Sequence, residues 1–361
     1  MIYLDNQATT PLAPEAKAEM LRWLDGPAGT GFANPHSSHR MGRQAEAAVE
    51  VARERVAALF PHGGTVVFTS SATEALNLAL RGCEPGRSGR PVAVSAIEHS
   101  AVLNTALDLP GDTTILPVDR DGLIDPQLAL PHDVGVVAVM QVNNEIGTVQ
   151  PVADLYARAQ AAGALFVCDA VQAAGRMPIA QADLIAVSAH KFYGPKGVGA
   201  LWVRDGVDLQ PVTTGGGQES GLRSGTLSPA LCAGMGVAAQ LAVDQMEQDA
   251  EHVATLWGRA LELFADWQIN GSVQHRYKGN LNVRRDGLDV GRLMSEVREV
   301  MFSTGSACAS ESGKPSRIPA AIGLTQEQSR GSIRLGFGRY TTMAELEEAA
   351  GMINRAAAQQ G

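Results

Sequence analysis

The sequence lacks the features that would place a protein in a membrane, on a membrane surface or on nucleic acid. None of its apolar runs approaches the roughly 18 residues that a membrane-spanning helix needs. Its first residues have neither a basic region nor a long apolar core, so we expect no signal peptide. Lys and Arg total 29 against 38 Asp and Glu, a net charge of −9, whereas binders of nucleic acid or anionic membranes need concentrated positive charge. We therefore expect a cytoplasmic protein with no nucleic-acid and no membrane partner.

Cysteine is also scarce. The chain has 4 cysteines, Cys83, Cys168, Cys232 and Cys308, which are widely spaced and form no CxxC pair. This pattern argues against a disulfide framework and against structural zinc, so we expect no metal site. Cys168 ends an apolar strand and, like Cys232, is interpreted as a core residue. Cys83 lies in a stretch rich in Gly, Pro and Arg and receives no role.

The 361 residues, 45% of them hydrophobic, suffice for two domains with sizeable cores. Residues 42–60 repeat apolar positions at helical spacing, and residues 152–162 are predicted as a further helix. Residues 66–68, 91–95, 134–142, 164–167, 184–187 and 200–203 are predicted as strands. Most are apolar throughout, as in a parallel sheet covered on both faces. We predict an α/β fold with a mostly parallel sheet, forming a large domain over residues 15–245.

The remainder of the chain predicts a smaller α+β domain over residues 246–361, with residues 1–14 packing on it. Helices are expected at 245–265, 289–300 and 343–358, and strands at 280–283 and 332–335. We find no repeat and no low-complexity linker. Cys308 would belong to this smaller domain.

Polar residues follow the predicted strands, and open α/β sheets bind ligands at the carboxyl ends of their strands. Residues 70–73 form a hydroxyl-rich turn before a helix, which is typical of an anion site. Simple capping by Ser71, in a capping box with Glu74, is an equally good explanation of this turn. Asp169 directly follows a strand and is a charge partner or a helix cap.

Lys191 and His99 follow two further strands. A buried lysine has a lowered pKa and can attack a carbonyl to form an imine, although most lysines are solvated. A lone histidine is more often structural than catalytic. Together, however, a lysine for an imine, an acid for a protonated ring nitrogen and a helix N-terminus for phosphate are what pyridoxal phosphate needs.

The motifs resemble those of cysteine desulfurases of the NifS/IscS type, in the class V aminotransferase group of fold-type I pyridoxal-phosphate enzymes. The matching segments run through almost the whole chain: residues 3–11, 34–39, 68–74, 98–102, 142–147, 188–197, 215–219, 223–226, 305–308 and 333–335. The resemblance implies a fold-type I transferase that converts L-cysteine to L-alanine and a persulfide. The sulfur would serve iron–sulfur clusters or other sulfur compounds.

The resemblance also assigns roles to single residues. Lys191 would carry the cofactor, Asp169 would pair with its ring nitrogen, His99 would stack on the ring and move protons, and Gln172 would bind the ring hydroxyl. The phosphate would be held by Ala72, Thr73, Ser188, His190 and Thr226. In the family, the threonine at the position of Thr226 reaches the cofactor of the neighbouring subunit, which implies a homodimer. Asn144 contributes to the cofactor site and, with Arg334, would hold the substrate carboxylate; an ordinary salt bridge is the other interpretation of Arg334.

Cys308 decides the reaction. Residues 305–314 are small or polar with almost nothing apolar to pack, so we expect a mobile loop and a reactive rather than a buried thiol. By resemblance, the Cys308 thiolate takes the sulfur of the substrate and passes it to an acceptor protein, such as an iron–sulfur scaffold or sulfur carrier.

Two alternatives stay open beside this interpretation. A selenocysteine lyase shares most of these residues, whereas an aminotransferase has no need of Cys308. A non-catalytic relative would not need Lys191, Asp169, His99 and Cys308 together. The chain ends soon after its last predicted helix, which puts docking of a scaffold protein in doubt. Gln218 is His in some relatives, so no helper role is assigned to it.

Overall fold

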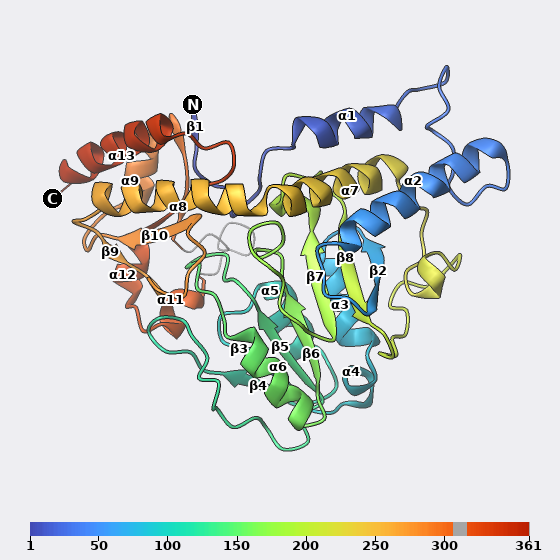
Figure 1. Ribbon diagram of the computed structural model, residues 1–361. Helices are drawn as coiled ribbons and strands as arrows, with labels where there is room; N and C mark the ends of the chain where they lie inside the picture. The colour runs from blue at the N-terminus through green and yellow to red at the C-terminus, as the bar shows by residue number, and fades with distance from the viewer. Residues whose placement is uncertain (306–315, 361) are drawn as a thin grey trace.

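The computed structural model describes residues 1–305 and 316–360. Figure 1 shows a large sheet covered by helices on one side of the molecule and a smaller sheet with its own helices on the other. Helices α7 (Pro229–Asp244) and α8 (Met246–Leu263) run end to end along the top of both parts. Helices α1 (Pro14–Arg22) and α2 (Arg40–Ala57) pack on α7 and extend away from the small part.

The large sheet has seven strands in the order β2-β8-β7-β6-β5-β3-β4. They are β2 (Gly64–Thr69), β3 (Val92–Ser95), β4 (Thr113–Leu116), β5 (Val136–Met140), β6 (Leu165–Asp169), β7 (Leu184–Ser188) and β8 (Gly199–Arg204). Only β8 runs antiparallel to its neighbours β2 and β7. The prediction of a mostly parallel α/β sheet is therefore confirmed. Strand β4, half exposed at the sheet edge, is not among the predicted strands.

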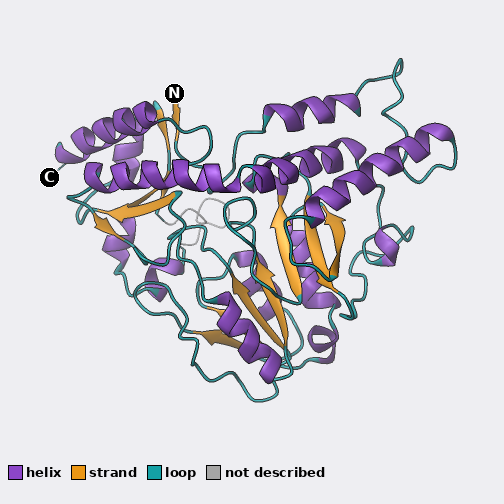
Figure 2. Cartoon of the chain, in the orientation of Figure 1, coloured by secondary structure: helices purple, strands orange, loops and turns teal. Residues whose placement is uncertain are grey.

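Alternate residues of this sheet belong to two apolar clusters. Figure 2 shows the helices that lie on either side of the strands. One face packs against α2, α6 (Val152–Ala161) and α7, and the other against α3 (Ala72–Gly82) and α5 (Ser100–Leu107). The short helix α4 (Glu84–Ser88) follows α3. The 3-10 turns η1 (Ala189–Lys191) and η2 (Glu219–Gly221) flank β8 in the chain. Burial of both faces explains why the strands are apolar throughout.

The smaller part is built on a four-stranded antiparallel sheet of order β12-β13-β10-β9. Its strands are β9 (Gln268–Ile269), β10 (Asn280–Arg284), β12 (Ser303–Thr304) and β13 (Ser332–Gly336). Helices α8, α9 (Val290–Glu296) and α13 (Met343–Ala358) pack on it in a separate apolar cluster, which also takes Ile2 and Leu4. The division near residue 245 stays a prediction, which these separate clusters support. The short helices α11 (Ile318–Ala321) and α12 (Gln326–Arg330) complete the described elements.

One predicted helix is too long. Residues 289–300 were expected to be helical, but α9 ends at Glu296. The reason is tertiary: Val300 and Met301 form strand β11 (Val300–Met301), which pairs in parallel with β1 (Ile2–Tyr3). Over the described part of the chain, no helix combines the length and apolar character that crossing a membrane requires.

Candidate active site

A cavity of about 510 Å³ lies at the carboxyl ends of β5, β6 and β7, facing the small sheet. Of the predicted site residues that the structure describes, all but Thr226 line it: Ala72, Thr73, His99, Asn144, Asp169, Gln172, Ser188, His190, Lys191 and Arg334. These residues come from six separate segments of sequence, so the fold itself brings them together.

Lys191 ends the 3-10 turn that follows β7 and is only partly exposed. Its Nζ donates to the carbonyl oxygens of Gln7 and Ala8, each at 2.7 Å. Burial, with the nearby charges of Arg176 and Arg334, lowers the pKa of Lys191 to about 7, while Asp169 and Asp5 oppose the shift. A large fraction of this amine is therefore neutral near pH 7, the form that attacks a carbonyl.

Asp169 is the last residue of β6 and is buried. Burial raises the pKa of its carboxyl, whereas nearby His99, the backbone N–H of Val171 and Lys191 lower it. A cationic ring nitrogen placed beside it would further favour the ionised form. Asp169 is thus an acid held in the cavity wall without a fixed salt-bridge partner among the described residues.

His99 is the N-cap of α5, and its Nδ1 accepts a hydrogen bond of 3.1 Å from the backbone N–H of Ala101. In the neutral imidazole this bond places the ring proton on Nε2. The cap fixes the ring at the edge of the cavity, close enough to Asp169 to act on its charge.

Of the two purposes proposed for the hydroxyl-rich turn after β2, helix capping by Ser71 is confirmed. Ser71 caps α3 by accepting from the Glu74 backbone N–H, while Ala72 and Thr73 at the helix start line the cavity. The capping box itself is only half present, because the Glu74 carboxylate accepts from the Ser70 N–H and pairs with Arg223. A helix N-terminus favours an anion, so the anion site at Ala72 and Thr73 stays a prediction.

Ser188 and His190 lie beside that turn, on the far side of β8. A Cβ on Gly199 would come within 2.6 Å of Ser71, so only glycine permits this close approach of strand and turn. His190 Nδ1 lies 3.1 Å from the Thr9 hydroxyl, and burial with Lys191 lowers the pKa of His190 to about 4. It is therefore a neutral hydrogen-bonding group in this structure.

Gln172 is buried, and its amide has partners within the protein. Its Nε2 donates to the Gln7 carbonyl at 2.9 Å, and its Oε1 accepts from Arg176. The side chain lines the cavity, and its hydrogen bond to Gln7 of the N-terminal segment fixes its orientation. The sequence carried no signal for this arrangement.

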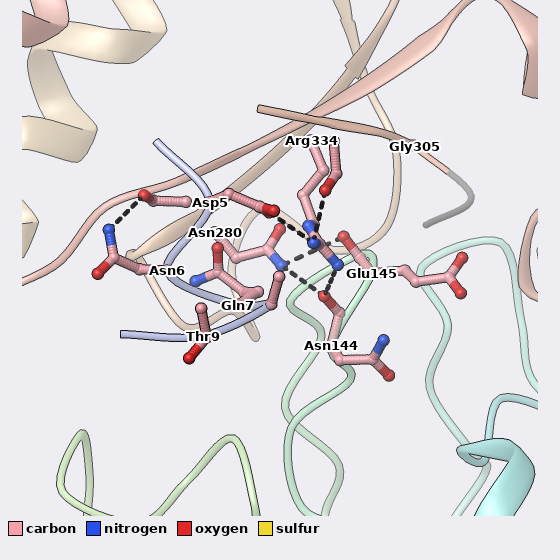
Figure 3. A network of polar contacts seen from close by, with 12 residues as sticks. Asp5, Asn6, Gln7, Thr9, Asn144, Glu145, Asn280, Gly305 and Arg334 are labelled. Carbon is pink, nitrogen blue, oxygen red and sulfur yellow. Dashed lines mark hydrogen bonds and ion pairs between the residues drawn. The ribbon is translucent and has the colours of Figure 1, made fainter. Parts of the chain in front are cut away.

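Arg334, on β13, is the largest fully buried side chain described. Its Nη1 donates to the Asn144 carbonyl at 2.9 Å, and its Nη2 donates to Asp5 and to the Ser303 hydroxyl (Figure 3). Its Nε is buried and has no hydrogen-bond partner. An ordinary salt bridge, the alternative considered for Arg334, is therefore present, and Nε, one donor of this cavity-lining residue, stays unused.

The remaining two predicted residues are Thr226 and Cys308. Thr226 is exposed and is not part of the cavity wall of its own chain. Cys308 lies outside the described residues. Cys168 and Cys232 are buried, which confirms their interpretation as core residues, and Cys83 is buried as well. Burial raises the pKa of all three thiols, so none is an activated nucleophile.

The cavity-wall residues that the sequence did not reveal include Asp5, Gln7, Ala8 and Ser303. Gln7 and Ala8 act through backbone carbonyls, which no side-chain pattern reveals. Asp5 lies in a segment that matched the family motifs, and that match was the only available signal.

Comparison with known proteins identifies the family. The model of the family described as aminotransferase class-V matches residues 2–348. The chain belongs to the aminotransferase class-V family. A cysteine desulfurase IscS of Rickettsia akari (strain Hartford) is 40% identical to this class-V chain over 98% of it and 90% of the relative. An IscS of Rickettsia prowazekii (strain Madrid E) is 38% identical with the same coverage.

Solved structures agree with this class-V assignment. A NifS-like protein superposes with a TM-score of 0.90 at 29% identity and covers 99% of both chains. A structure described as SspA in complex with cysteine has a TM-score of 0.81 at 32% identity, over 95% of this chain and 100% of that one. The fold is therefore that of fold-type I enzymes, whose cofactor is pyridoxal phosphate.

The class-V chain fits that cofactor on its own geometry. The cavity offers a partly neutral amine, a buried acid, a helix N-terminus against which Gly199 lets strand β8 pack closely, and a buried guanidinium donor without a partner. These are the groups that an aldehyde, a ring nitrogen, a phosphate and a substrate carboxylate require.

Proposed function

We propose that this protein is a pyridoxal-phosphate-dependent cysteine desulfurase that converts L-cysteine to L-alanine and leaves a persulfide on Cys308. The observation that carries the proposal is that Lys191, Asp169 and Arg334 line one cavity, where the charges of Asp169 and Arg334 both act on the pKa of the Lys191 amine. The bound cofactor supplies an electron sink that makes bonds at the substrate Cα and Cβ labile.

The residues of the chain divide the remaining work. Lys191 carries the cofactor, and Asp169 holds the positive charge of its ring nitrogen. Ala72, Thr73, Ser188 and His190 surround the phosphate position at the start of α3. Gln172 and His99 complete the contacts of the ring.

Arg334 and Asn144 receive the substrate carboxylate. The unpartnered Nε of Arg334 supports this role, because a buried donor without an acceptor costs free energy that a carboxylate oxygen would recover. Lys191 and His99 are the groups of the cavity that can take and return protons, since both line it and Lys191 has a pKa near 7.

The sulfur transfer balances without an external oxidant. The C–S bond of L-cysteine breaks and an S–S bond to Cys308 forms, so the two sulfur atoms lose one electron each and the substrate Cβ gains both. The proton lost by the Cys308 thiol ends on the alanine product. The persulfide then passes to an acceptor protein that builds iron–sulfur clusters or other sulfur compounds.

We further propose a homodimer in the cytoplasm. Thr226 is exposed outside its own cavity, which is consistent with a phosphate contact to a second copy. Leu21, Leu24 and Phe32 are exposed apolar side chains of the N-terminal arm and would be covered in a dimer. The described cysteines are free thiols, which suits a reducing compartment. Light scattering of the purified protein tests the oligomeric state.

The deciding experiment compares wild-type protein with Cys308→Ser. Both should show the visible absorbance of bound cofactor, and only the wild type should release alanine and sulfide from L-cysteine. Full activity of Cys308→Ser would reject the persulfide and leave a lyase. A colourless wild type would reject the cofactor.

A further inference from the structure

The loop after β5, residues 143–147, is held rigidly and carries more than Asn144. The Asn143 side chain is fully buried; its Oδ1 accepts from the N–H groups of Glu145 and Ile146 at 2.8 and 2.9 Å. Its Nδ2 donates to the carbonyl of Ile97, two positions before His99. The loop is therefore fixed to the segment that presents His99.

Glu145 connects this loop to the residue that follows the undescribed segment 306–315. Glu145 is fully buried, and the Ser316 hydroxyl lies 3.0 and 2.9 Å from its two carboxylate oxygens. The same hydroxyl accepts from the Ile318 N–H at the start of α11. A carboxylate buried this deeply needs such donors, because its charge is costly away from water.

The residue before the segment is connected to Glu145 as well. The Asn282 Nδ2 donates both to the Glu145 carbonyl at 3.0 Å and to the Gly305 carbonyl at 3.1 Å. Gly305 also donates to the Ser332 carbonyl at 2.7 Å, an approach so close that a Cβ would lie 2.4 Å from the Ser332 side chain. Figure 3 shows Glu145 and Gly305 in the same network as Arg334.

An apolar cluster reinforces the contact on the Ser316 side. Ile318 of α11 and Ile322, which directly follows this helix, pack with Ile146 of the loop and with Ile97. The packing joins α11 to the two loops that carry His99 and Asn144. Buried aliphatic contacts of this kind resist displacement because interiors are close-packed.

We propose that Glu145 is a positioning residue for the sulfur-transfer step: its carboxylate fixes Ser316, which follows the Cys308 segment, to the loop that carries Asn144, while Asn282 joins the backbone of that loop to Gly305. The inference rests on the proposed function, because it concerns the delivery of the Cys308 thiol to a substrate held by Asn144 and Arg334. Glu145 makes no contact with the substrate in this role. A purely structural role, in which the contact only stabilises the fold, is the alternative to be tested.

The test uses the full chain with cofactor and the variants Glu145→Ala, Ser316→Ala and their combination. Sulfide release from L-cysteine should fall about tenfold or more, since misplacement of a reacting group by about 1 Å costs up to 10²-fold. The L-cysteine concentration that half-saturates the cofactor's absorbance change should stay near the wild-type value. Because both changes remove one contact, the double variant should be no slower than the slower single variant.

Two further variants serve as controls. Glu145→Gln keeps a carbonyl oxygen for the Ser316 hydroxyl and should restore most of the sulfide release that Glu145→Ala loses. Thr325→Ala removes the capping box of the neighbouring helix α12 without touching Glu145, and should release sulfide at the wild-type rate. Equal slowing in Thr325→Ala would show a structural effect and overturn the proposal.

Hydrogen exchange of the cofactor-free protein tests the connection separately from activity. The amide of Ile318 should exchange faster in Glu145→Ala, while those of Gly305 and of α12 should not. The positioning role would be overturned if the exchange rates stayed unchanged in Glu145→Ala. It would also be overturned if the half-saturating L-cysteine concentration rose by as large a factor as the rate of sulfide release fell. A wild type that releases no sulfide would instead reject the proposed function, and the exchange result would still decide the connection.

Discussion

Asp5 and Arg334 form an ion pair in which Oδ1 of Asp5 lies 2.7 Å from Nη2 of Arg334, although the residues are 329 positions apart. The Arg334 side chain is only 2% exposed, so an unpaired guanidinium there would be costly. Asp5 follows β1, whose pairing with β11 brings the start of the chain to the site. The pair keeps Arg334 charged and oriented in the cavity wall before a substrate carboxylate arrives.

Arg334→Lys should weaken the binding of L-cysteine. Lysine keeps the positive charge but loses the planar guanidinium, which donates to Asn144 and to Asp5 and leaves Nε for the substrate carboxylate. We expect the KM for L-cysteine to rise about 10- to 100-fold, with the cofactor absorbance unchanged. Steady-state kinetics measure this, and an unchanged KM would assign the carboxylate to another residue.

Lys191 should make the stability of the cofactor-free protein depend on pH. Burial lowers its pKa in the folded state to about 7 from an ordinary value of 10.5, so the unfolded chain binds more protons between these values. Its contribution therefore destabilises the fold fully below pH 7, and this cost is relieved as pH rises toward 10. Each unit of pKa difference corresponds to about 1.4 kcal/mol.

The matched variant for this prediction is Lys191→Met. Relative to wild type, it should gain stability at pH 6, and the gain should shrink by pH 9, when the lysine is largely neutral. Urea unfolding of both cofactor-free proteins at the two pH values gives the difference. A difference that does not change with pH would contradict the lowered pKa.

Asp169→Asn should separate function from stability. The amide cannot hold a cationic ring nitrogen, so we expect kcat to fall about 100-fold or more. Burial raises the pKa of Asp169 in the free protein, which means that its ionised form is already disfavoured there. The cofactor-free variant should therefore unfold at the same or a higher urea concentration than wild type, and a large loss of stability would contradict this reading.

Asp183 should be a strong contributor to stability far from the cavity. Its fully buried carboxylate accepts from the Phe166 N–H and from Arg204, each at 2.7 Å, and from Gln160. Asp183→Ala leaves these donors unsatisfied and should cost about 3 kcal/mol. The exposed pair of Asp208 with Arg87 provides the control, since Asp208→Ala should cost about 0.5 kcal/mol or less. Similar urea midpoints for the two variants would contradict the prediction.

Much of the fold could be predicted because it is encoded locally. The apolar strands β5, β6 and β7 and the amphipathic helix α2 follow from burial patterns that hold wherever a covered sheet forms. The cavity residues Asp169 and Lys191 were found because strand ends of one parallel sheet meet at one edge. The family motifs added Arg334, whose role no pattern within the sequence could distinguish from a salt bridge.

The sequence by itself determined the type of fold, the carboxyl-end location of the site and the residue types in it, because these depend on neighbours in the chain. Only the tertiary structure decided that α9 stops at Glu296 and that β8 runs against its neighbours, since both follow from pairing with distant strands. It also decided that Gln7 and Ala8 hold the Lys191 amine and that Asp5 pairs with Arg334. Those contacts join residues more than 180 positions apart, and no local propensity specifies them.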